Sequence, residues 1–496
     1  MKRRIRSIGL LMVSLCLTVA TSVHGEELRR LSLEEAIRLA QTQSVDAAVA
    51  LNELKTSYWE YRTYKANLLP ELMLTGIAPN YMKQYSTYQE SDGSFSFVRN
   101  NALEVTGELS ATQNIWLTGG KLSFTSSLNY LQQLGADGNS SFMAIPFGLT
   151  LSQSIFGVNE IKWQRKIEPV RYKEAKANFV SATEEVTMKT ITYYFNYLLA
   201  CENVGIAEQN HRNAQKMYNV AVAKRKMGQI SENELMQMHL LQLNAESTLT
   251  DNQSYMKNAL FKLRSFLGLD EDVTLELQLP GQVPYVRLDY KDVLEKAQEN
   301  HSFSLNIRRR QLQAEYEVAK ARGGLRDVNL FVSVGYTGKA NEFADAYGGL
   351  RDNQVVKVGV TMPLLDWGKR KGRVKVAQSN LQVTESRLKQ EQMNFSQDIF
   401  ILVEQFNNQN KQLSIAIEAD TIAGKRYRTS IETFMVGSIN TLELNDAQMS
   451  KDVARRKWID ELYYYWYYYY QLRSITLWDF LQNQSIDAEF DKIVNS

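Results

Sequence analysis

The sequence predicts an α+β membrane protein made of two related halves, each combining long helical hairpins with strands suited to a barrel wall. Two observations predict this fold class. A glycine flanked by helical patterns occurs twice in matching contexts, and segments of alternating polarity stand beside long tracts without proline. A basic and then apolar N-terminus indicates in addition that the chain is exported.

The repeated glycine segment is the main sign of duplication. The pattern Gly-x-Ile-x-x-x-Glu-Leu begins at Gly228 and again at Gly437, 209 positions later, and the same offset aligns five further identical residues upstream. Each glycine stands where a helix would need a residue of positive φ to end, and the next helix would begin at Ser231 or Asn440. We therefore predict two helical hairpins with their tips at residues 228 and 437.

The N-terminus has the composition of a signal peptide. Basic residues precede the apolar segment 8–20, which is too short to span a membrane stably, and the residues up to Gly25 offer a cleavage site. We expect no lipid at Cys16, because the preceding Leu15 is too large for a lipidation site. Only Cys201 then remains, which excludes a disulfide framework and a cysteine metal cluster.

The composition gives no sign of chemistry. The formal net charge of +2 provides no reason to expect a nucleic-acid partner, and no apolar run after the signal peptide is long enough for a membrane helix. The sequence has no glycine-rich phosphate loop, no paired-histidine motif and no recognisable Ser/His/Asp set. We predict no enzyme, no cofactor and no metal site.

The first half begins with a predicted helix at residues 31–65, for which Ser32 is the N-cap. Its counterpart begins near residue 288, at an offset of 257 rather than 209. The first half therefore carries about 48 additional residues between its first helix and its long helix.

The strands are predicted from alternation of apolar and polar residues. Alternating segments occur at residues 103–112, 121–130, 143–151, 328–336 and 356–364. A half-buried soluble sheet would give the same pattern as a barrel wall between lipid and water. The connections favour the barrel: residues 116–120 form a tight turn, whereas residues 87–101, 133–141 and 338–353 read as longer polar loops.

The long helices follow from the distribution of proline. Residues 171–279 and 364–496 contain none, and the helix before each tip would run for 65 to 70 residues, or roughly 100 Å. The helix after Gly228 has an apolar seam with a step close to 3.6 residues, which suits coiled-coil packing with little supercoil.

The assembled pattern resembles the TolC-like outer-membrane efflux protein family over about residues 27–480. The resemblance rests on residues 66–70 before the first strand, 151–156 after the strands of the first half, and 436–441 at the second tip. It implies a homotrimer in which each chain gives four strands to a shared barrel of twelve. The helices would continue that barrel as a tunnel across the periplasm, with tips that dock on a periplasmic adaptor and an inner-membrane pump.

These considerations predict the division of the chain. The predicted parts are a signal peptide at 1–25, a first repeat at 26–279 with strands at about 70–156, a linker at 280–287, a second repeat at 288–480 with strands at about 328–365, and a C-terminal tail at 481–496.

The additional 48 residues depart from the family pattern. We expect them to add one hairpin, residues 103–113 and 121–130, to the sheet, which would give six strands per chain and eighteen per trimer. The alternative is an extracellular elaboration of a twelve-stranded barrel.

The resemblance also implies a site. Acidic residues six and nine positions after the second tip glycine narrow the periplasmic mouth in the family, and here these are Glu443 and Asp446; position six of the first repeat is Glu234. Copies of these carboxylates would form a cation-attracting ring in a trimer. The alternative is that they are exposed carboxylates of a helix surface. The predicted docking residues are Met227, Gly228, Gln229, Ile230, Ser231, Val436, Gly437, Ser438, Ile439, Asn440 and Thr441.

The function implied by this resemblance is a channel-tunnel of the cell outer membrane, extending into the periplasm. It would export small molecules or proteins within a tripartite efflux or type I secretion system. The competing interpretation is a periplasm-spanning scaffold without a conduit. Tips without clusters of methionine and histidine do not favour a dedicated copper exporter.

Overall fold

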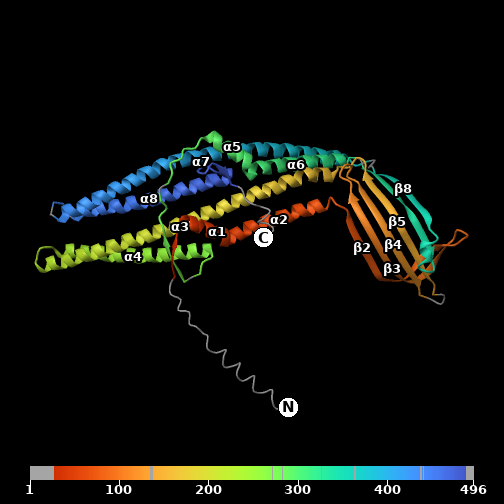
Figure 1. Ribbon diagram of the computed structural model, residues 1–496, viewed down its shortest axis with the longest axis horizontal. Coiled ribbons are helices and arrows are strands. Elements are labelled where there is room, and N and C mark those ends of the chain that lie inside the picture. The colour runs from red at the N-terminus through yellow and green to blue at the C-terminus, as the bar shows by residue number, and fades with distance from the viewer. Residues whose placement is uncertain are drawn as a thin grey trace, which may run out of the picture. The chain divides into compact units, whose positions relative to one another are not determined.

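A computed structural model of the chain describes residues 27–134, 138–270, 272–281, 283–325, 327–361, 365–435, 438–439 and 441–486. It confirms the predicted fold class, with long helices and one large sheet (Figure 1). The predicted signal peptide and residues 487–496 of the predicted tail lie outside the described residues.

The helices demonstrate the duplication directly, because each has a counterpart of equal length. Within the described residues the pairs are α1 (Leu33–Gln43) with α5 (Tyr290–Asn300), α2 (Val45–Ala66) with α6 (Ser302–Gly323), α3 (Glu160–Lys226) with α7 (Lys369–Met435), and α4 (Glu232–Leu267) with α8 (Thr441–Thr476). The pair lengths are 11, 22, 67 and 36 residues. The first two pairs have the offset of 257 and the last two that of 209, so the additional residues lie between α2 and α3.

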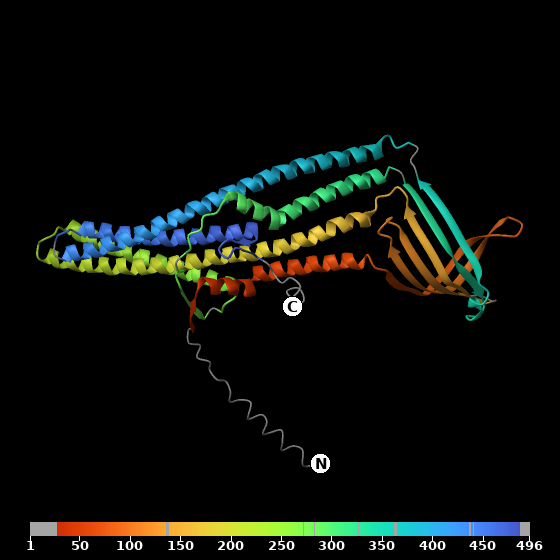
Figure 2. The same cartoon turned by 45° about the horizontal axis from the view of Figure 1, so that its top comes forward.

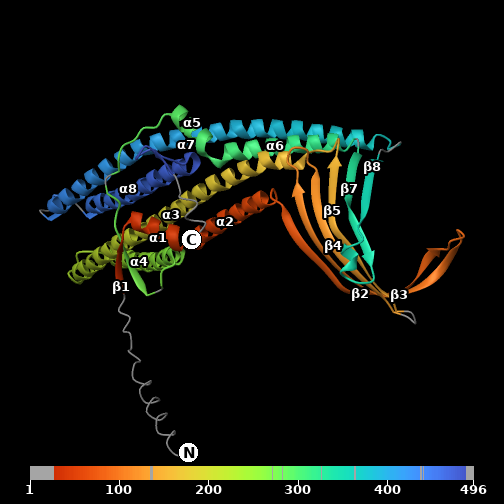
Figure 3. The same ribbon diagram turned by 45° about the vertical axis from the view of Figure 1, so that its right-hand side comes forward.

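These additional residues lie in the sheet. Among the described residues, one six-stranded antiparallel sheet has the order β2-β3-β4-β5-β7-β8 (Figure 3). Its strands are β2 (Glu71–Gln89), β3 (Phe95–Asn114), β4 (Lys121–Gln133), β5 (Ser140–Ser154), β7 (Asp327–Ala340) and β8 (Arg351–Thr361). The β3–β4 hairpin is inserted between β2 and β5, so the first half supplies four strands and the second half two.

One predicted loop is wrong. Residues 87–101 are mostly strand: β2 and β3 remain paired up to Gln89 and Phe95, and β4 joins the ladder only from Ala102 onward. The two strands therefore extend beyond their neighbours as a hairpin (Figure 3). The serine, asparagine and glycine content of this segment is typical of loops, and it conceals a ladder that is held by backbone hydrogen bonds.

The chain divides into two compact units. Among the described residues, the first comprises 27–51, 180–297 and 399–486. In it α4 folds back along α3 and α8 along α7 (Figure 2). The rings of Phe406 in α7 and Tyr465 in α8 lie 5.4 Å apart, and both side chains are buried. This unit also contains the parallel pair β1 (Glu27–Leu31) and β6 (Val273–Leu277), and the short strands β9 (Trp478–Asp479) and β10 (Gln484–Ser485).

Among the described residues, the second unit comprises 52–179 and 298–398, and it contains the sheet. Its helix segments are joined by ion pairs, since Arg309 of α6 contacts Glu174 of α3 at 2.6 Å and Arg310 contacts Glu391 of α7 at 2.6 Å. None of the described helices combines the length and the hydropathy that a membrane crossing requires.

Candidate functional site

The first tip has the geometry that the sequence predicts. Gly228 has a φ of +74°, and no atom lies within 4 Å of the position that a Cβ would take. The amide of Gln229 donates to the carbonyl of Lys224 at 3.0 Å, and Gly228 donates to Arg225 at 2.9 Å, which satisfies carbonyls at the end of α3. The backbone conformation itself therefore favours glycine at this position.

The new helix begins at Ser231, as predicted. The Ser231 hydroxyl accepts from the amide of Glu234 at 3.2 Å, and the Glu234 carboxylate accepts from the Ser231 amide at 2.7 Å. This reciprocal pair is a capping box. The hydrogen bonds from the backbone and hydroxyl of Ser231 lower the pKa of Glu234.

The second tip repeats one hydrogen bond of the first. Ser438 donates to the carbonyl of Thr433 at 3.0 Å, which is the Gln229–Lys224 bond displaced by 209 positions. Ser438 is exposed and Ile439 is half-buried, whereas the predicted tip residues Val436, Gly437 and Asn440 lie outside the described residues. Thr441 is the first residue of α8.

The surface of the first tip combines apolar and polar side chains. Met227 is 63% exposed, Gln229 is exposed and Ile230 is half-buried. Arg225 stabilises the turn, because its guanidinium donates to the Ile230 carbonyl at 3.1 Å and pairs with Glu232 at 3.1 Å. A methionine exposed on an ordered turn offers another protein an apolar and adaptable contact.

The three predicted carboxylates occupy different environments. Glu234 is engaged in its capping box, and Glu443 is exposed in the first turn of α8, where a negative charge is favourable. Asp446 lies one turn further along α8 and pairs with Arg426 of α7 at 2.5 Å. Since Glu443 and Asp446 are three residues apart, both project from the same side of α8.

Polar ties that the sequence reasoning missed connect α8 to α3. Asn213 donates to the Gln448 side chain at 3.0 Å, and Gln448 also contacts Asn210. Arg455 lies 3.0 Å from Glu202 of α3 and 3.8 Å from Asp420 of α7. These pairs bring together residues about 30 to 250 positions apart, so no local pattern indicates them.

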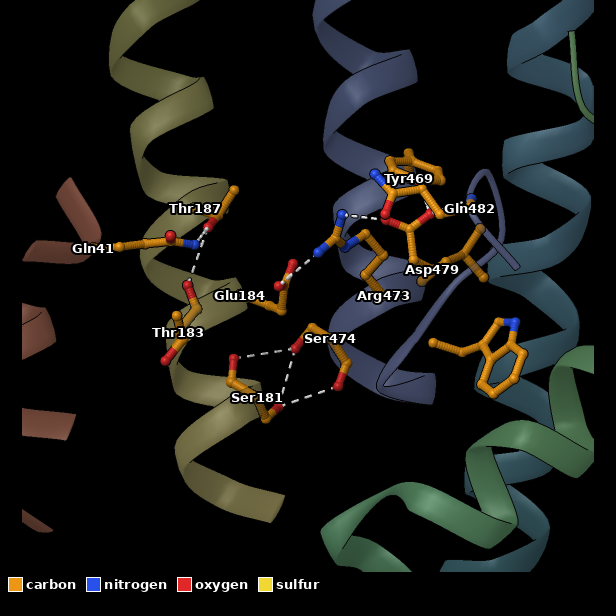
Figure 4. Close-up of polar contacts among 12 residues, drawn as sticks. Gln41, Ser181, Thr183, Glu184, Thr187, Tyr469, Arg473, Ser474, Asp479 and Gln482 are labelled. Carbon is orange, nitrogen blue, oxygen red and sulfur yellow. Dashed lines mark hydrogen bonds and ion pairs between the residues drawn. The ribbon is translucent and has the colours of Figure 1, made fainter. Parts of the chain in front are cut away.

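A buried charge cluster fastens the C-terminal end of α8 to α3 (Figure 4). Arg473 stands between two carboxylates, donating to Glu184 of α3 at 3.1 Å and to Asp479 at 2.8 Å. Tyr469 donates to Asp479 at 2.6 Å, and Ser181 and Ser474 lie within hydrogen-bond distance beside them. Burial raises the pKa of Glu184, although the nearby Arg473 opposes this shift.

The sheet has two faces of opposite character. The register places apolar side chains together on one face: Leu72, Leu74, Leu109, Phe124, Leu128, Tyr130, Phe142, Leu149, Leu151, Val332, Val334, Tyr336, Val356 and Val358. The opposite face is mostly polar. There Asn80 and Asn129 both donate to Glu104, and the hydroxyls of Thr150 and Ser333 lie 3.1 Å apart. Such a sheet suits a boundary between lipid and water.

Comparison with known proteins agrees with this geometry. The profile of the family described as outer membrane efflux protein matches residues 36–269 and 300–475. The chain belongs to the outer membrane efflux protein family. It is accordingly an efflux channel of the outer membrane that extends into the periplasm, and not an enzyme.

Solved structures with the same fold are distant in sequence. The chain is similar to the CmeC outer membrane channel of Campylobacter jejuni, with a TM-score of 0.66, 14% identity, and coverage of 93% of this chain and 88% of that one. It is similar to CusC, with a TM-score of 0.60, 16% identity, and coverage of 90% and 91%. It is also similar to the outer membrane protein VceC of Vibrio cholerae, with a TM-score of 0.60, 14% identity, and coverage of 90% and 95%. No curated protein sequence matched.

Proposed function

We propose that three copies of this chain form a channel-tunnel that receives cargo from an inner-membrane pump through a periplasmic adaptor. The observation that carries this proposal is the two-faced sheet, with apolar side chains on one face and polar ones on the other. A scaffold without a conduit would have no use for a polar face opposite a lipid-facing one. The cargo is a small molecule or an exported protein.

Single-channel recording in planar bilayers tests the conduit. Purified protein is expected to insert as a trimer and to give discrete conductance steps. Native mass measurement in detergent supplies the number of chains. Trimers that insert but never conduct would favour the scaffold, and a stable monomer would remove the proposed assembly altogether.

The proposed gate lies at the helical tips. Pairs such as Arg426–Asp446 and Asn213–Gln448 hold the helices of each copy together, and Glu443, Asp446 and Glu234 narrow the mouth between copies. In the closed state, contacts between the helices seal the tips; in the open state, the helices are untwisted. An adaptor that binds the tips of the open state more tightly than those of the closed state would shift the equilibrium toward the open channel. Energy for transport comes from the pump.

Replacing Gly228 with valine is expected to abolish export while trimers persist. A β-branched residue at φ of +74° costs about 1–2 kcal/mol and distorts the tip on which the adaptor docks. The measurement combines an export assay with cross-linking between tip and adaptor in cells.

Gly205 provides a matched control within the same helix. Its φ is not positive and a Cβ there would meet no atom within 4 Å, so Gly205→Ala is expected to leave export unchanged. If Gly228→Val exports and cross-links as well as Gly205→Ala does, the docking role of the first tip is wrong.

A further inference from the structure

The sheet of one chain ends in two strands that each have a free side. Within the described residues, β2 pairs only with β3 and β8 pairs only with β7. An unpaired row of backbone donors and acceptors cannot remain in lipid, because no water is present to satisfy it. Each edge therefore needs a strand from another copy of this chain.

The stagger of the sheet determines which residues can meet. The row of paired residues that begins at Glu71 passes through Thr112, Ser123, Thr150 and Ser333 and reaches β8 at Val355. Strand β8 then continues for six more residues, to Thr361. The intermediate strands end progressively between these limits, so the strands are tilted across the ladder.

We propose that residues 71–77 of one copy pair antiparallel with residues 355–361 of the next, so that three sheets close into one barrel of eighteen strands. This inference rests on the proposed trimer. It places the start of β2 opposite the end of β8, where both strands adjoin helices. Leu74 then lies opposite Val358, and Thr75 lies opposite Lys357.

The side chains agree with this register. Leu74 and Val358 both belong to the apolar face and are 78% and 63% exposed in the single chain. A shift of one residue would place apolar side chains of one copy beside the polar face of the next. The pairing stops at Ile77, because the β2–β3 ladder is irregular between Ile77 and Asn80 and Pro79 has no amide to donate.

The tilt agrees with it as well. Six residues of stagger over six strand spacings correspond to a tilt of about 35°, which is within the range of membrane barrels. Eighteen strands at this tilt give a backbone diameter of roughly 30 Å, against roughly 20 Å for twelve strands. The inserted β3–β4 hairpin therefore widens the outer-membrane opening, which suits bulky cargo.

Cysteine pairs across the proposed seam test the register. Cys201 is the free cysteine of the described chain, and Cys201→Ser supplies the background. Leu74→Cys with Val358→Cys is expected to form disulfides between copies on the lipid side, and Thr75→Cys with Lys357→Cys on the lumen side, because directly opposed strand residues lie within disulfide distance. The control, Leu74→Cys with Lys357→Cys, places the thiols on opposite faces and should not link.

The products distinguish the proposed barrel from its alternatives. Oxidation in membranes is expected to give a ladder of linked chains that ends at three. A ladder that ends at two would mean twelve strands and overturn the inference, as would trimers that conduct without linking through either pair. A monomer that neither links nor conducts would instead mean that the proposed function has failed.

Discussion

Replacing Arg473 with methionine is expected to lower the free energy of unfolding by about 3–5 kcal/mol. The side chains of Glu184 and Asp479 are only 4% and 7% exposed, and both are paired with Arg473. Removing the guanidinium would leave two buried carboxylates without a counter-charge. Thermal unfolding of the purified protein in detergent measures the loss.

An exposed arginine of α3, the helix that carries Glu184, is the control. Arg212 pairs with Glu208 on the surface of α3, so Arg212→Met is expected to change stability by no more than about 0.5 kcal/mol. Adding Glu184→Gln to Arg473→Met should restore part of the lost free energy of unfolding, because it removes one of the two buried carboxylates that have no counter-charge. Equal melting temperatures for Arg473→Met and Arg212→Met would contradict the structural role of the cluster.

The second large effect concerns the mouth of the channel. The double variant Glu443→Gln with Asp446→Asn is expected to weaken block by polyvalent cations about tenfold or more, and to reduce cation selectivity. Three copies would otherwise place six carboxylates near the axis, where each attracts cations. Single-channel recordings with cations added from the periplasmic side measure both quantities.

The variant Arg426→Gln tests whether Asp446 acts through its negative charge at the mouth or through its contact with α7. It breaks the Arg426–Asp446 pair, which Asp446→Asn also breaks, but it retains both carboxylates. If the carboxylates line the mouth, Arg426→Gln should keep or strengthen cation block while the double variant loses it. If both variants behave alike, Asp446 serves only to join α7 and α8.

Local chemistry made the helices predictable. Residues 171–279 and 364–496 contain no proline, although α3 begins earlier and includes Pro169. Ser32 and Ser231 provided caps, and Gly228 marked a turn that the backbone confirms with positive φ. The difference of 48 residues between the two offsets, 257 and 209, predicted where the halves differ, because an insertion shifts the numbering of everything after it. These signals act over a few residues or by simple counting, so the sequence displays them directly.

Contacts between distant segments could not be predicted in the same way. The parallel β1–β6 pair joins two segments of five residues, too short for a recognisable pattern. Arg426 meets Asp446 and Glu184 meets Arg473 only because particular helices pack side by side with a particular rotation. The β2–β3 extension was hidden for another reason, since the serine, asparagine and glycine content of residues 87–101 is typical of a loop.

The two halves contribute different numbers of strands to the sheet, four and two, and this difference bears on how such a chain can evolve. The paired helices have identical lengths, as two hairpins must if their tips are to reach the same level. Strands follow a different rule: an added antiparallel hairpin leaves and re-enters the sheet on one side, so the following helix keeps its direction. In the proposed barrel, the pore diameter can therefore grow in increments of two strands per copy without any change in the helices, whereas the gain of a single strand would reverse the direction of every element that follows it.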